Sequence, residues 1–497
     1  MSSCRQWDTI RIYIYLRLFS DQNIIRSFSN SVRMRKVQDS QRALVLQGGG
    51  SLGAYEAGAY QALYERITKT DREKGVKGKP FLDIVAGTSI GAINAAIIVS
   101  YVVENKTWEG SSERLNEFWE YLSKESPLDQ IPGFTAWWDY LHNNIHNGIA
   151  SGEAARRYYS AKQFSITGVP TVFFPLIPLF DTRFFDPQKI WYRFDSGPLK
   201  RSLERFAKFP IATSFDEKSS LPQPRLLLVS VDVAEGAAVT FDSYETEDGS
   251  RKSEYGKYIS QNGKVGPEHI IRYNDGITSE HVIASASVPI NFSYSALEVE
   301  SYNNNTANYE KNMRYFWDGG IMSNTPLTQL VRLHRLYWLK VKGLTDTVPK
   351  LEIGIVNVHP VKQDTIPWDH DGVINRNIDI TFSDRTEREQ QALLLVSDYV
   401  DLARELIKIA KDNGAKDEVI DNLLNSKTMN HGQTMIPRKY SDILVGQFEI
   451  GRVIRINRKN DEHTISDKIF DFSPKTIKHL RESGYSNSMD LSDVEFS

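Results

Sequence analysis

The sequence predicts an α/β protein with a parallel central sheet and crossover helices. Two short apolar runs, residues 43–46 and 81–86, have the length of buried strands, and each is followed by a turn of small residues and then by a segment of helical length. This order is typical of parallel sheets, because parallel neighbours need a crossover connection. The chain has 497 residues, of which 40% are hydrophobic, and this is enough for one large α/β domain with insertions.

The first strand-turn-helix unit contains a run of glycines. The strand at 43–46 leads into Gly48-Gly49-Gly50-Ser51-Leu52-Gly53, and residues 54–67 follow as a helix. Glycines allow successive backbone N–H groups to turn towards one point, and the N-terminus of the next helix adds positive potential there. The run therefore predicts a site that stabilises a negatively charged oxygen. It also fits the dinucleotide pattern GxGxxG, but that pattern expects an acidic residue at the end of the second strand, and Asp83 lies near its start.

The second unit surrounds one serine. The strand at 81–86 leads into Gly87-Thr88-Ser89-Ile90-Gly91, and an apolar run rich in alanine and isoleucine continues to Val103. This is the order of a nucleophile elbow, in which a tight turn exposes a serine hydroxyl at a helix N-terminus. An ordinary strand-turn-helix with a chance serine is the alternative. Residues 84–103 lack charge, but a turn lies among them, so we expect a strand and a buried helix and no transmembrane segment.

The later elements follow from runs of strand length and from helical spacing. Residues 225–233, 239–241, 270–272, 312–317, 351–358 and 453–456 are expected as strands. Residues 112–124, 199–206, 279–286, 325–341, 383–412 and 473–483 are expected as helices. Proline supports two of these boundaries, because Pro289 disfavours continuation of the helix before it and Pro326 suits the first turn of the next one.

Composition excludes several classes of function. The net charge of -3 and the isoelectric point near 6.4 give no electrostatic case for nucleic acid. Cys4 is the single cysteine, which excludes an intramolecular disulfide and a cysteine-based metal site, and suits a reducing compartment. The apolar patch near the N-terminus is interrupted by Arg11 and Arg17, so no secretory signal is expected. We expect a cytoplasmic protein without metal or cofactor, and we predict no oligomeric state.

A nucleophilic serine needs a base, and two residues are candidates. Asp318 directly follows the strand at 312–317 and precedes two glycines, so its carboxylate could take the serine proton if partial burial raises its basicity. An ordinary Asp-Gly turn would explain the same residues. His359 follows the strand at 351–358, and the order Ser89, Asp318, His359 is that of an α/β-hydrolase triad.

These motifs together resemble the patatin-like phospholipases. The resemblance rests on the run from Gly48 to Gly53, on the serine motif, on Asp318-Gly319-Gly320 with Asn324 and Pro326, and on Ala284-Ser285-Ala286-Ser287-Val288-Pro289 with Phe292, and it covers roughly residues 40–345. It implies a three-layer α/β/α sandwich with a mainly parallel sheet. Many members of the family have arginine or lysine where Leu52 stands, so a positive charge within the glycine loop is not expected here.

The resemblance also implies residue roles. Ser89 would be the nucleophile and Asp318 the base of a dyad without a catalytic histidine. Backbone N–H groups of Gly48, Gly49, Gly50 and Ile90 would form the oxyanion hole, and Gly53, Gly87, Gly91, Gly319 and Gly320 complete the motifs. The implied reaction is hydrolysis of a fatty-acyl ester of a phospholipid or acylglycerol through an acyl-enzyme. A catalytically silent lipid-binding or scaffold protein is the alternative.

The resemblance suggests three regions. Residues 1–39, rich in arginine and serine, are expected to be a disordered basic extension, residues 40–345 the catalytic domain, and residues 346–497 a mostly helical C-terminal extension that packs on it. Residues 105–200 are an aromatic-rich insertion or cap. Within it, residues 134–180 combine aromatic residues with a proline-broken apolar run, and we expect either a lid, a reversible contact with a membrane, or a loop packed over the core.

Overall fold

The computed structural model describes residues 40–76, 78–125, 132–144, 151–176, 193–215, 222–260, 265–344, 348–427, 439–444 and 450–491. The chain divides into two compact units. The described residues of unit 1 fall within 328–351 and 386–451, with Ser40, and those of unit 2 fall within 41–327, 352–385 and 452–497. The predicted extension at 1–39 lies outside the described residues.

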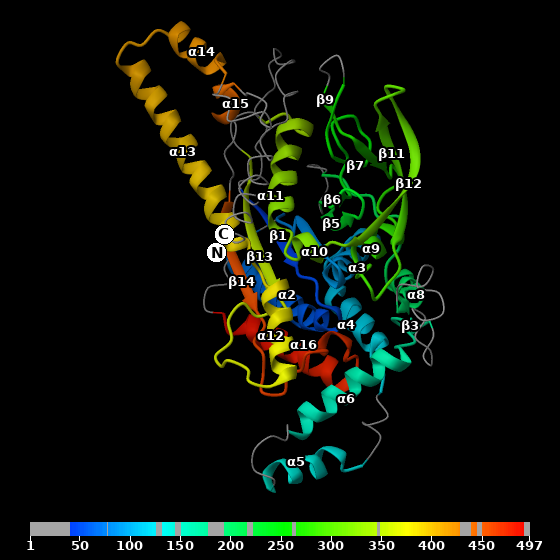
Figure 1. The fold of residues 1–497 in the computed structure, drawn as a ribbon. Coiled ribbons are helices and arrows are strands. Elements are labelled where there is room, and N and C mark those ends of the chain that lie inside the picture. Colours follow the sequence, from blue (N-terminus) through cyan, green and yellow to red (C-terminus); the bar gives the residue numbers. More distant parts are fainter. Residues whose placement is uncertain are drawn as a thin grey trace. The chain divides into compact units, whose positions relative to one another are not determined.

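Unit 2 is built on a ten-stranded sheet in the order β14-β13-β1-β2-β5-β12-β11-β10-β7, with β6 also paired to β5 (Figure 1). The strands are β1 (Ser40–Leu46), β2 (Ile84–Thr88), β5 (Arg225–Asp232), β6 (Ala237–Asp242), β7 (Lys252–Tyr255), β10 (His269–Arg272), β11 (Ser295–Asn303), β12 (Asn308–Asp318), β13 (Lys350–Asn357) and β14 (Ile450–Asn457). The pairs β1–β2 and β2–β5 are parallel, and helices flank the sheet. The predicted α/β/α architecture is therefore confirmed.

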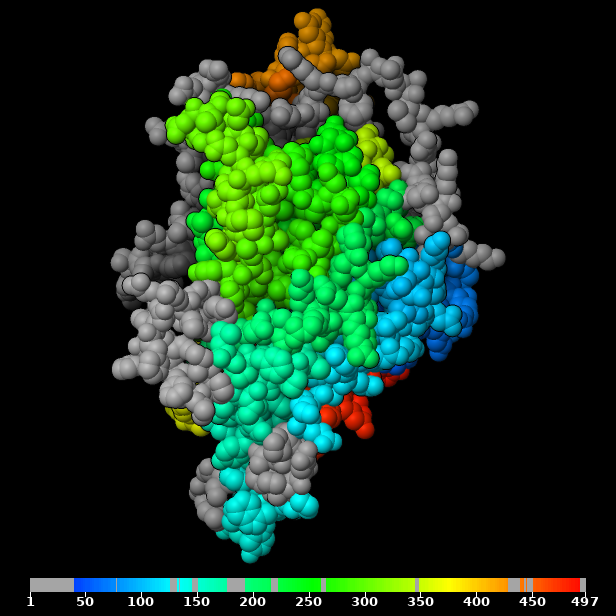
Figure 2. All heavy atoms as spheres, turned by 90° about the vertical axis from the view of Figure 1, so that its right-hand side faces the viewer, coloured from blue at the N-terminus to red at the C-terminus, as the bar shows by residue number. Residues whose placement is uncertain are grey.

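The sheet turns antiparallel beyond β5. Strand β12 pairs antiparallel with β5 and β11, and β10 pairs antiparallel with β11 and β7. Figure 2 shows this part of unit 2 as a continuous green surface. Residues on β11 and β12 alternate between buried and exposed near the sheet centre, as expected for strands covered on one face. The register places Thr88 opposite Val229 and Asp318 opposite the next residue, Ser230, so the ends of β2 and β12 meet across β5.

Two crossover helices follow the two parallel strands. These are α2 (Gly53–Glu73), which η1 (Gly50–Leu52) precedes, and α3 (Ile90–Asn105). Because α3 carries apolar residues on all sides, it is buried along nearly its whole length. The Asn94 amide on α3 donates to the carbonyl of Gly53 at 3.0 Å and accepts from the Trp119 indole at 3.1 Å, so one buried side chain joins three helices.

The remaining elements of unit 2 include several that sequence patterns did not indicate. They are α4 (Ser111–Leu122), α5 (Phe134–Asn144), α6 (Gly152–Thr167), β3 (Phe174–Pro175), β4 (Phe194–Asp195), α8 (Gly197–Phe206), β8 (Tyr258–Ile259), β9 (Val265–Gly266), α9 (Ser279–Ser285), α10 (Gly320–Ser323), α12 (His370–Phe382), η4 (Lys468–Phe470) and α16 (Pro474–Met489). Unit 1 contains α11 (Leu327–Leu336), a π-helical turn at Tyr337–Val341, α13 (Thr386–Asp412), α14 (Asp417–Asn425) and α15 (Tyr440–Leu444). None of the helices in these described ranges is long and apolar enough to cross a bilayer.

The last helix, α16, packs tightly against α2. A Cβ atom placed on Gly58 would lie 1.9 Å from the carbonyl oxygen of Arg481, and one on Gly484 would lie 2.0 Å from that of Tyr55. Both glycines are therefore required for the close approach of the two helices. As a result, the end of the chain is part of the core of unit 2.

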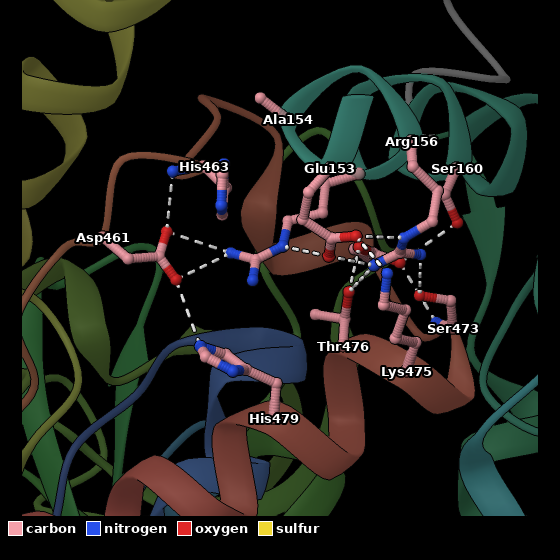
Figure 3. A network of polar contacts seen from close by, with 12 residues as sticks. Glu153, Ala154, Arg156, Ser160, Asp461, His463, Ser473, Lys475, Thr476 and His479 are labelled. Carbon is pink, nitrogen blue, oxygen red and sulfur yellow. Dashed lines mark hydrogen bonds and ion pairs between the residues drawn. The ribbon is translucent and has the colours of Figure 1, made fainter. Parts of the chain in front are cut away.

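The C-terminal segment is also tied to α6 by a network of charged and hydroxyl side chains (Figure 3). Arg156 donates to Ser473 at 2.9 Å and to Thr476 at 2.8 Å, and Arg157 donates to Asp461 at 3.0 Å. Glu153 accepts from both arginines. Although burial raises the pKa of Glu153, hydrogen bonds from the surrounding cations bring it down to about 2. The network therefore holds α6 on the C-terminal segment through paired, mostly buried charges.

Candidate active site

Ser89 lies in the turn between β2 and α3 with strained backbone angles. Its φ is 57° and its ψ is -125°, a conformation that non-glycine residues rarely adopt. The flanking glycines allow this turn, because a Cβ atom on Gly87 would lie 2.2 Å from the carbonyl oxygen of Gly91, and one on Gly91 would lie 2.4 Å from that of Leu46. The geometry is that of a nucleophile elbow, with the serine at the N-terminus of a buried helix.

Ser285 on α9 fixes the elbow from below. Its hydroxyl accepts a hydrogen bond from the Ser89 N–H at 3.1 Å and donates one to the Val229 carbonyl at 2.5 Å. Its own carbonyl accepts from the Gly319 N–H at 3.3 Å. One buried serine thus links the elbow, the central strand β5 and the turn after Asp318. The sequence showed this residue only as part of a motif, because an isolated serine in a short helix gives no signal of such a role.

Asp318 is the last residue of β12 and is buried. Its Oδ1 accepts a hydrogen bond from the Gly320 N–H at 2.7 Å, while Oδ2 has no hydrogen-bond partner within the described residues. Burial raises the pKa of Asp318 to about 6, and the Ser89 side chain and the Gly320 N–H act in the opposite direction. We interpret these two observations together: the Ser89 hydroxyl is close enough to influence the carboxylate but is not aligned for a full hydrogen bond.

The turn after Asp318 has no room for side chains. A Cβ atom on Gly319 would lie 2.2 Å from the Val229 carbonyl oxygen, and one on Gly320 would lie 3.0 Å from Oδ1 of Asp318 itself. The two glycines therefore allow the backbone to fold close to the carboxylate and to present the Gly320 N–H to it.

The glycine loop passes next to Ser89. A Cβ atom on Gly48 would lie 2.9 Å from Cβ of Ser89, and one on Gly53 would lie 2.6 Å from the Ile90 side chain. The Gly48 N–H donates to the Asn324 carbonyl over a long 3.4 Å. In the described part of the chain, the N–H groups of Gly49, Gly50 and Ile90 donate no hydrogen bond. Gly50 has a φ of 58°, which turns the backbone at this point.

Gln47 and Asn324 hold this loop in place. The Gln47 amide donates to Thr325 Oγ1 at 3.0 Å and to the Phe382 carbonyl at 3.1 Å, and its oxygen accepts from the N–H of His359 at 2.9 Å. The Asn324 amide donates to the Phe382 carbonyl at 2.7 Å and to the Gly48 carbonyl at 3.3 Å. Both amides therefore connect the loop to the end of α12, a connection between residues far apart in the sequence that spacing could not reveal.

His359 is buried behind the loop and pairs with a different carboxylate from the one that the triad alternative requires. Its Nδ1 lies 3.1 Å from Oδ1 of Asp379, and burial lowers the pKa of the imidazole. Asp379 also accepts from Lys468 at 2.5 Å and from Asn460 at 2.7 Å. Although burial raises the pKa of Asp379, its hydrogen bonds and the Lys468 charge bring it to about 2. His359 therefore belongs to a buried polar cluster supporting the loop.

The C-terminal segment also contacts the loop directly. The Ser51 hydroxyl donates to the Lys468 carbonyl at 2.7 Å, and a Cβ atom on Gly50 would lie 2.7 Å from the Ile469 carbonyl oxygen. Burial and the neighbouring Arg458 lower the pKa of Lys468 to about 7, against the opposing effect of Asp379. The cationic side chains nearest this part of the loop thus come from the far end of the chain, whereas position 52 within the loop is leucine.

Among the described residues, one group has its possible metal-ligand atoms within 4.8 Å of one another: Glu235, Glu268 and His269. Glu235 already pairs with Arg314 at 2.9 Å, so its charge is compensated without a cation. The group lies in the antiparallel part of the sheet and contributes no atom to the environment of Ser89.

The sequence matches the family described as Patatin-like phospholipase over residues 44–331, which is more than half of the chain. None of the curated proteins matches the chain. Among solved structures, the crystal structure of VipD from Legionella pneumophila is similar at 14% sequence identity and a TM-score of 0.28, and the match covers 90% of this chain. It covers 66% of the VipD chain, so this chain spans just under two thirds of that length. Ser89, Asp318 and the glycine loop all lie within the family match, and the chain belongs to the patatin-like phospholipases, a family of lipid acyl hydrolases.

Proposed function

We propose that this protein hydrolyses fatty-acyl esters of lipids with Ser89 as the nucleophile and Asp318 as the base. The observation that carries the proposal is the pairing of a strained elbow serine with a buried carboxylate whose Oδ2 is unpartnered within the described residues. The register that sets the ends of β2 and β12 across β5 supports it, because it brings the two residues together on rigid strands.

In the acylation step, Ser89 Oγ attacks the ester carbonyl while Asp318 accepts the hydroxyl proton. A pKa of about 6 makes Asp318 a stronger base than an ordinary carboxylate and still leaves it ionised at pH 7. The ester C–O bond then breaks, and the leaving alcohol takes the proton from Asp318. The fatty-acyl group remains on Ser89 as an ester.

In the deacylation step, Asp318 accepts a proton from water as the water oxygen attacks the acyl carbonyl. The tetrahedral intermediate collapses, the proton returns to Ser89 Oγ, and the fatty acid leaves. Both steps place negative charge on the carbonyl oxygen. The N–H groups of Gly49, Gly50 and Ile90 are the proposed donors to it, since each is uncommitted in the described part of the chain. Removal of one such donor typically costs about 2.7–4 kcal/mol of transition-state stabilisation.

Gly48 fits a different contribution to the oxyanion loop. Its N–H is directed to the Asn324 carbonyl, and its lack of a side chain lets the loop approach Ser89. We therefore assign the close approach to Gly48 and the donor role to the next two glycines. The substrate class, a phospholipid or an acylglycerol, is proposed from the family match. A peripheral membrane contact through residues 134–180 stays a prediction; within the described part of that region, Trp137 and Tyr140 are exposed on α5.

A fluorophosphonate probe together with a mixed-lipid panel tests the proposal. Wild-type protein should bind the probe covalently and release fatty acid, while Ser89→Ala should do neither and Asp318→Asn should lose ester turnover. Wild-type-like turnover by Ser89→Ala would refute the mechanism. Turnover retained by Asp318→Asn but lost in His359→Ala would favour the triad, and lipid binding without probe labelling would favour a silent lipid-binding protein.

A further inference from the structure

Helix α12 has polar residues on its buried side and apolar residues on its exposed side. Asn375 and Asp379 are buried, and both accept hydrogen bonds from the Lys468 ammonium group, at 2.7 and 2.5 Å. Val373, Ile374 and Ile380 are exposed. A surface helix in water normally shows the opposite arrangement, with its apolar stripe facing the core. The outward apolar face of α12 therefore indicates a partner other than water.

The loop before α12 continues the same exposed surface. Trp368 is 91% exposed and Ile366 is 75% exposed, the two largest exposed fractions among the large hydrophobic residues of the described chain. Val361, at the start of the loop, is also exposed. Single exposed apolar residues are ordinary, but a tryptophan and an isoleucine two residues apart beside an apolar helix face form a patch. A tryptophan in this position is typical of segments that enter the boundary between lipid headgroups and acyl chains.

The patch continues to the candidate active site. The carbonyl of Phe382, the last residue of α12, accepts from the amides of Gln47 and Asn324, which hold the glycine loop. Asn324 directly follows α10, where Ile321 and Met322 are exposed within four residues of Asp318. With 13 residues, α12 is about 20 Å long, so the apolar strip extends over that distance from the site.

The charges around the patch indicate how it would bind. Lys362 and Arg376 are the cationic side chains of residues 361–382, and three carboxylates near the surface, Asp364, Asp369 and Asp371, outnumber them. The Arg376 guanidinium also donates to the carbonyls of Pro360 and Val361. Attraction to anionic headgroups is therefore not the main source of affinity, and contact with a neutral apolar interior is favoured instead.

From these observations we propose that the loop at 361–369 and the exposed face of α12 dock on the surface of the lipid aggregate that contains the substrate. This inference rests on the proposed lipid-ester hydrolysis and names the surface by which the site reaches its substrate. Trp368 and Ile366 enter the lipid, Val373, Ile374 and Ile380 lie along it, and α10 places the entrance beside Asp318 at the interface. Binding at the patch then brings the ester carbonyl towards Ser89 without a change in the catalytic groups.

Flotation with neutral phosphatidylcholine vesicles tests the docking surface separately from catalysis. The parent protein for this assay is Ser89→Ala, so the vesicles stay intact. Because Ile366 and Trp368 are exposed, replacing both by serine should leave the fold unchanged, and it should lower vesicle binding by at least about tenfold, since each buried side chain contributes strongly to transfer from water. The matched control is Ile259→Ser on β8, which is 67% exposed and lies in the antiparallel part of unit 2; it should bind as the parent does. A roughly tenfold rise in salt should have little effect on binding.

Turnover supplies the second readout in the catalytically competent chain. Ile366→Ser/Trp368→Ser should hydrolyse a soluble short-chain ester as the wild type does and lose about tenfold in activity on vesicles. Absence of parent flotation, equal flotation of the double variant, or a change of the double variant from dimer to monomer in sedimentation would each overturn the proposal, the last by assigning the patch to a second copy. Vesicle binding through the patch without ester turnover by the wild type would instead refute the proposed function and leave the lipid-docking surface in place.

Discussion

Replacing the proposed base should make the protein more stable and inactive at the same time. The pKa of the buried Asp318 carboxyl is raised from 3.8 to about 6 because burial disfavours its ionised form. Folded protein therefore holds this proton between pH 3.8 and about 6 while unfolded protein has released it, so the contribution of Asp318 to stability falls as pH rises through that window. The shift of about 2 pH units corresponds to about 3 kcal/mol of lost stability at pH 7.

Asp318→Asn removes the ionisation and keeps an oxygen that accepts from the Gly320 N–H. We expect the variant to unfold at higher urea concentration than the wild type at pH 7.5, by up to about 3 kcal/mol, and the difference to shrink towards zero near pH 4. Circular dichroism during urea titration at both pH values measures this difference. Other titrating groups are common to the two proteins, so the comparison isolates Asp318.

Asp232 provides a control of opposite sign. It is buried in the same sheet, but Arg314 donates to both of its oxygens, and Tyr255 donates to one of them at 2.6 Å. Burial raises the pKa of Asp232, and these hydrogen bonds more than offset it, so the net shift is downward. Asp232→Asn should therefore destabilise the protein at neutral pH. If Asp318→Asn were less stable than the wild type at pH 7.5, or if its stability difference did not depend on pH, the reasoning about this carboxylate would be wrong.

Three other results are expected. Below a pH of about 6, kcat/KM for a soluble ester should fall about tenfold per pH unit as Asp318 takes up its proton, and a profile flat down to pH 4 would exclude it as the base. Ser285→Ala should lower kcat about tenfold with little change in KM, because the Ser89 N–H loses its acceptor; unchanged kcat in steady-state assays would contradict its role in fixing the elbow. Gly484→Ala should destabilise the protein by more than about 2 kcal/mol in urea titration, since its Cβ would overlap the Tyr55 carbonyl, whereas Glu482→Ala on the exposed side of the same helix should stay within about 0.5 kcal/mol.

Local patterns were sufficient to predict the first half of the sheet. The strands before Gly48 and Gly87, and the helices after them, are separated by short turns, so their order along the chain already indicates a parallel arrangement. The predicted strand at 81–86 is observed as Ile84–Thr88. Its start shifts because Asp83 is used as an acceptor instead, with its carboxylate bonded to the Arg42 N–H at 2.7 Å.

Elements with unusual burial were harder to predict. Periodicity analysis assumes that apolar residues face inwards, and α12 reverses this, with Asp379 inside and Ile380 outside. The antiparallel direction of β12 was also not visible in the sequence, since the strand's own pattern does not report the direction of its neighbour. Both features depend on contacts made by residues distant in the sequence.

The chemical motifs of the site were visible from local sequence, and their supports were not. Glycines around Ser89 and after Asp318 mark turns that side chains would obstruct, and such positions can be identified from residue type alone. Gln47 and Lys468, in contrast, act on the glycine loop through partners that lie hundreds of residues away. Common polar residues in such roles resemble any other glutamine or lysine until the fold is known.

The most direct test of the central claim is to identify the residue that holds the acyl group during turnover. Wild-type protein is mixed with a long-chain fatty-acyl ester, quenched in acid within the first turnovers, and digested for mass spectrometry. The proposed mechanism predicts a peptide containing Ser89 whose mass is increased by one fatty-acyl group, and no such peptide after Asp318→Asn substitution. Steady release of fatty acid with no acyl group on Ser89, or with the acyl group on another residue, would contradict it.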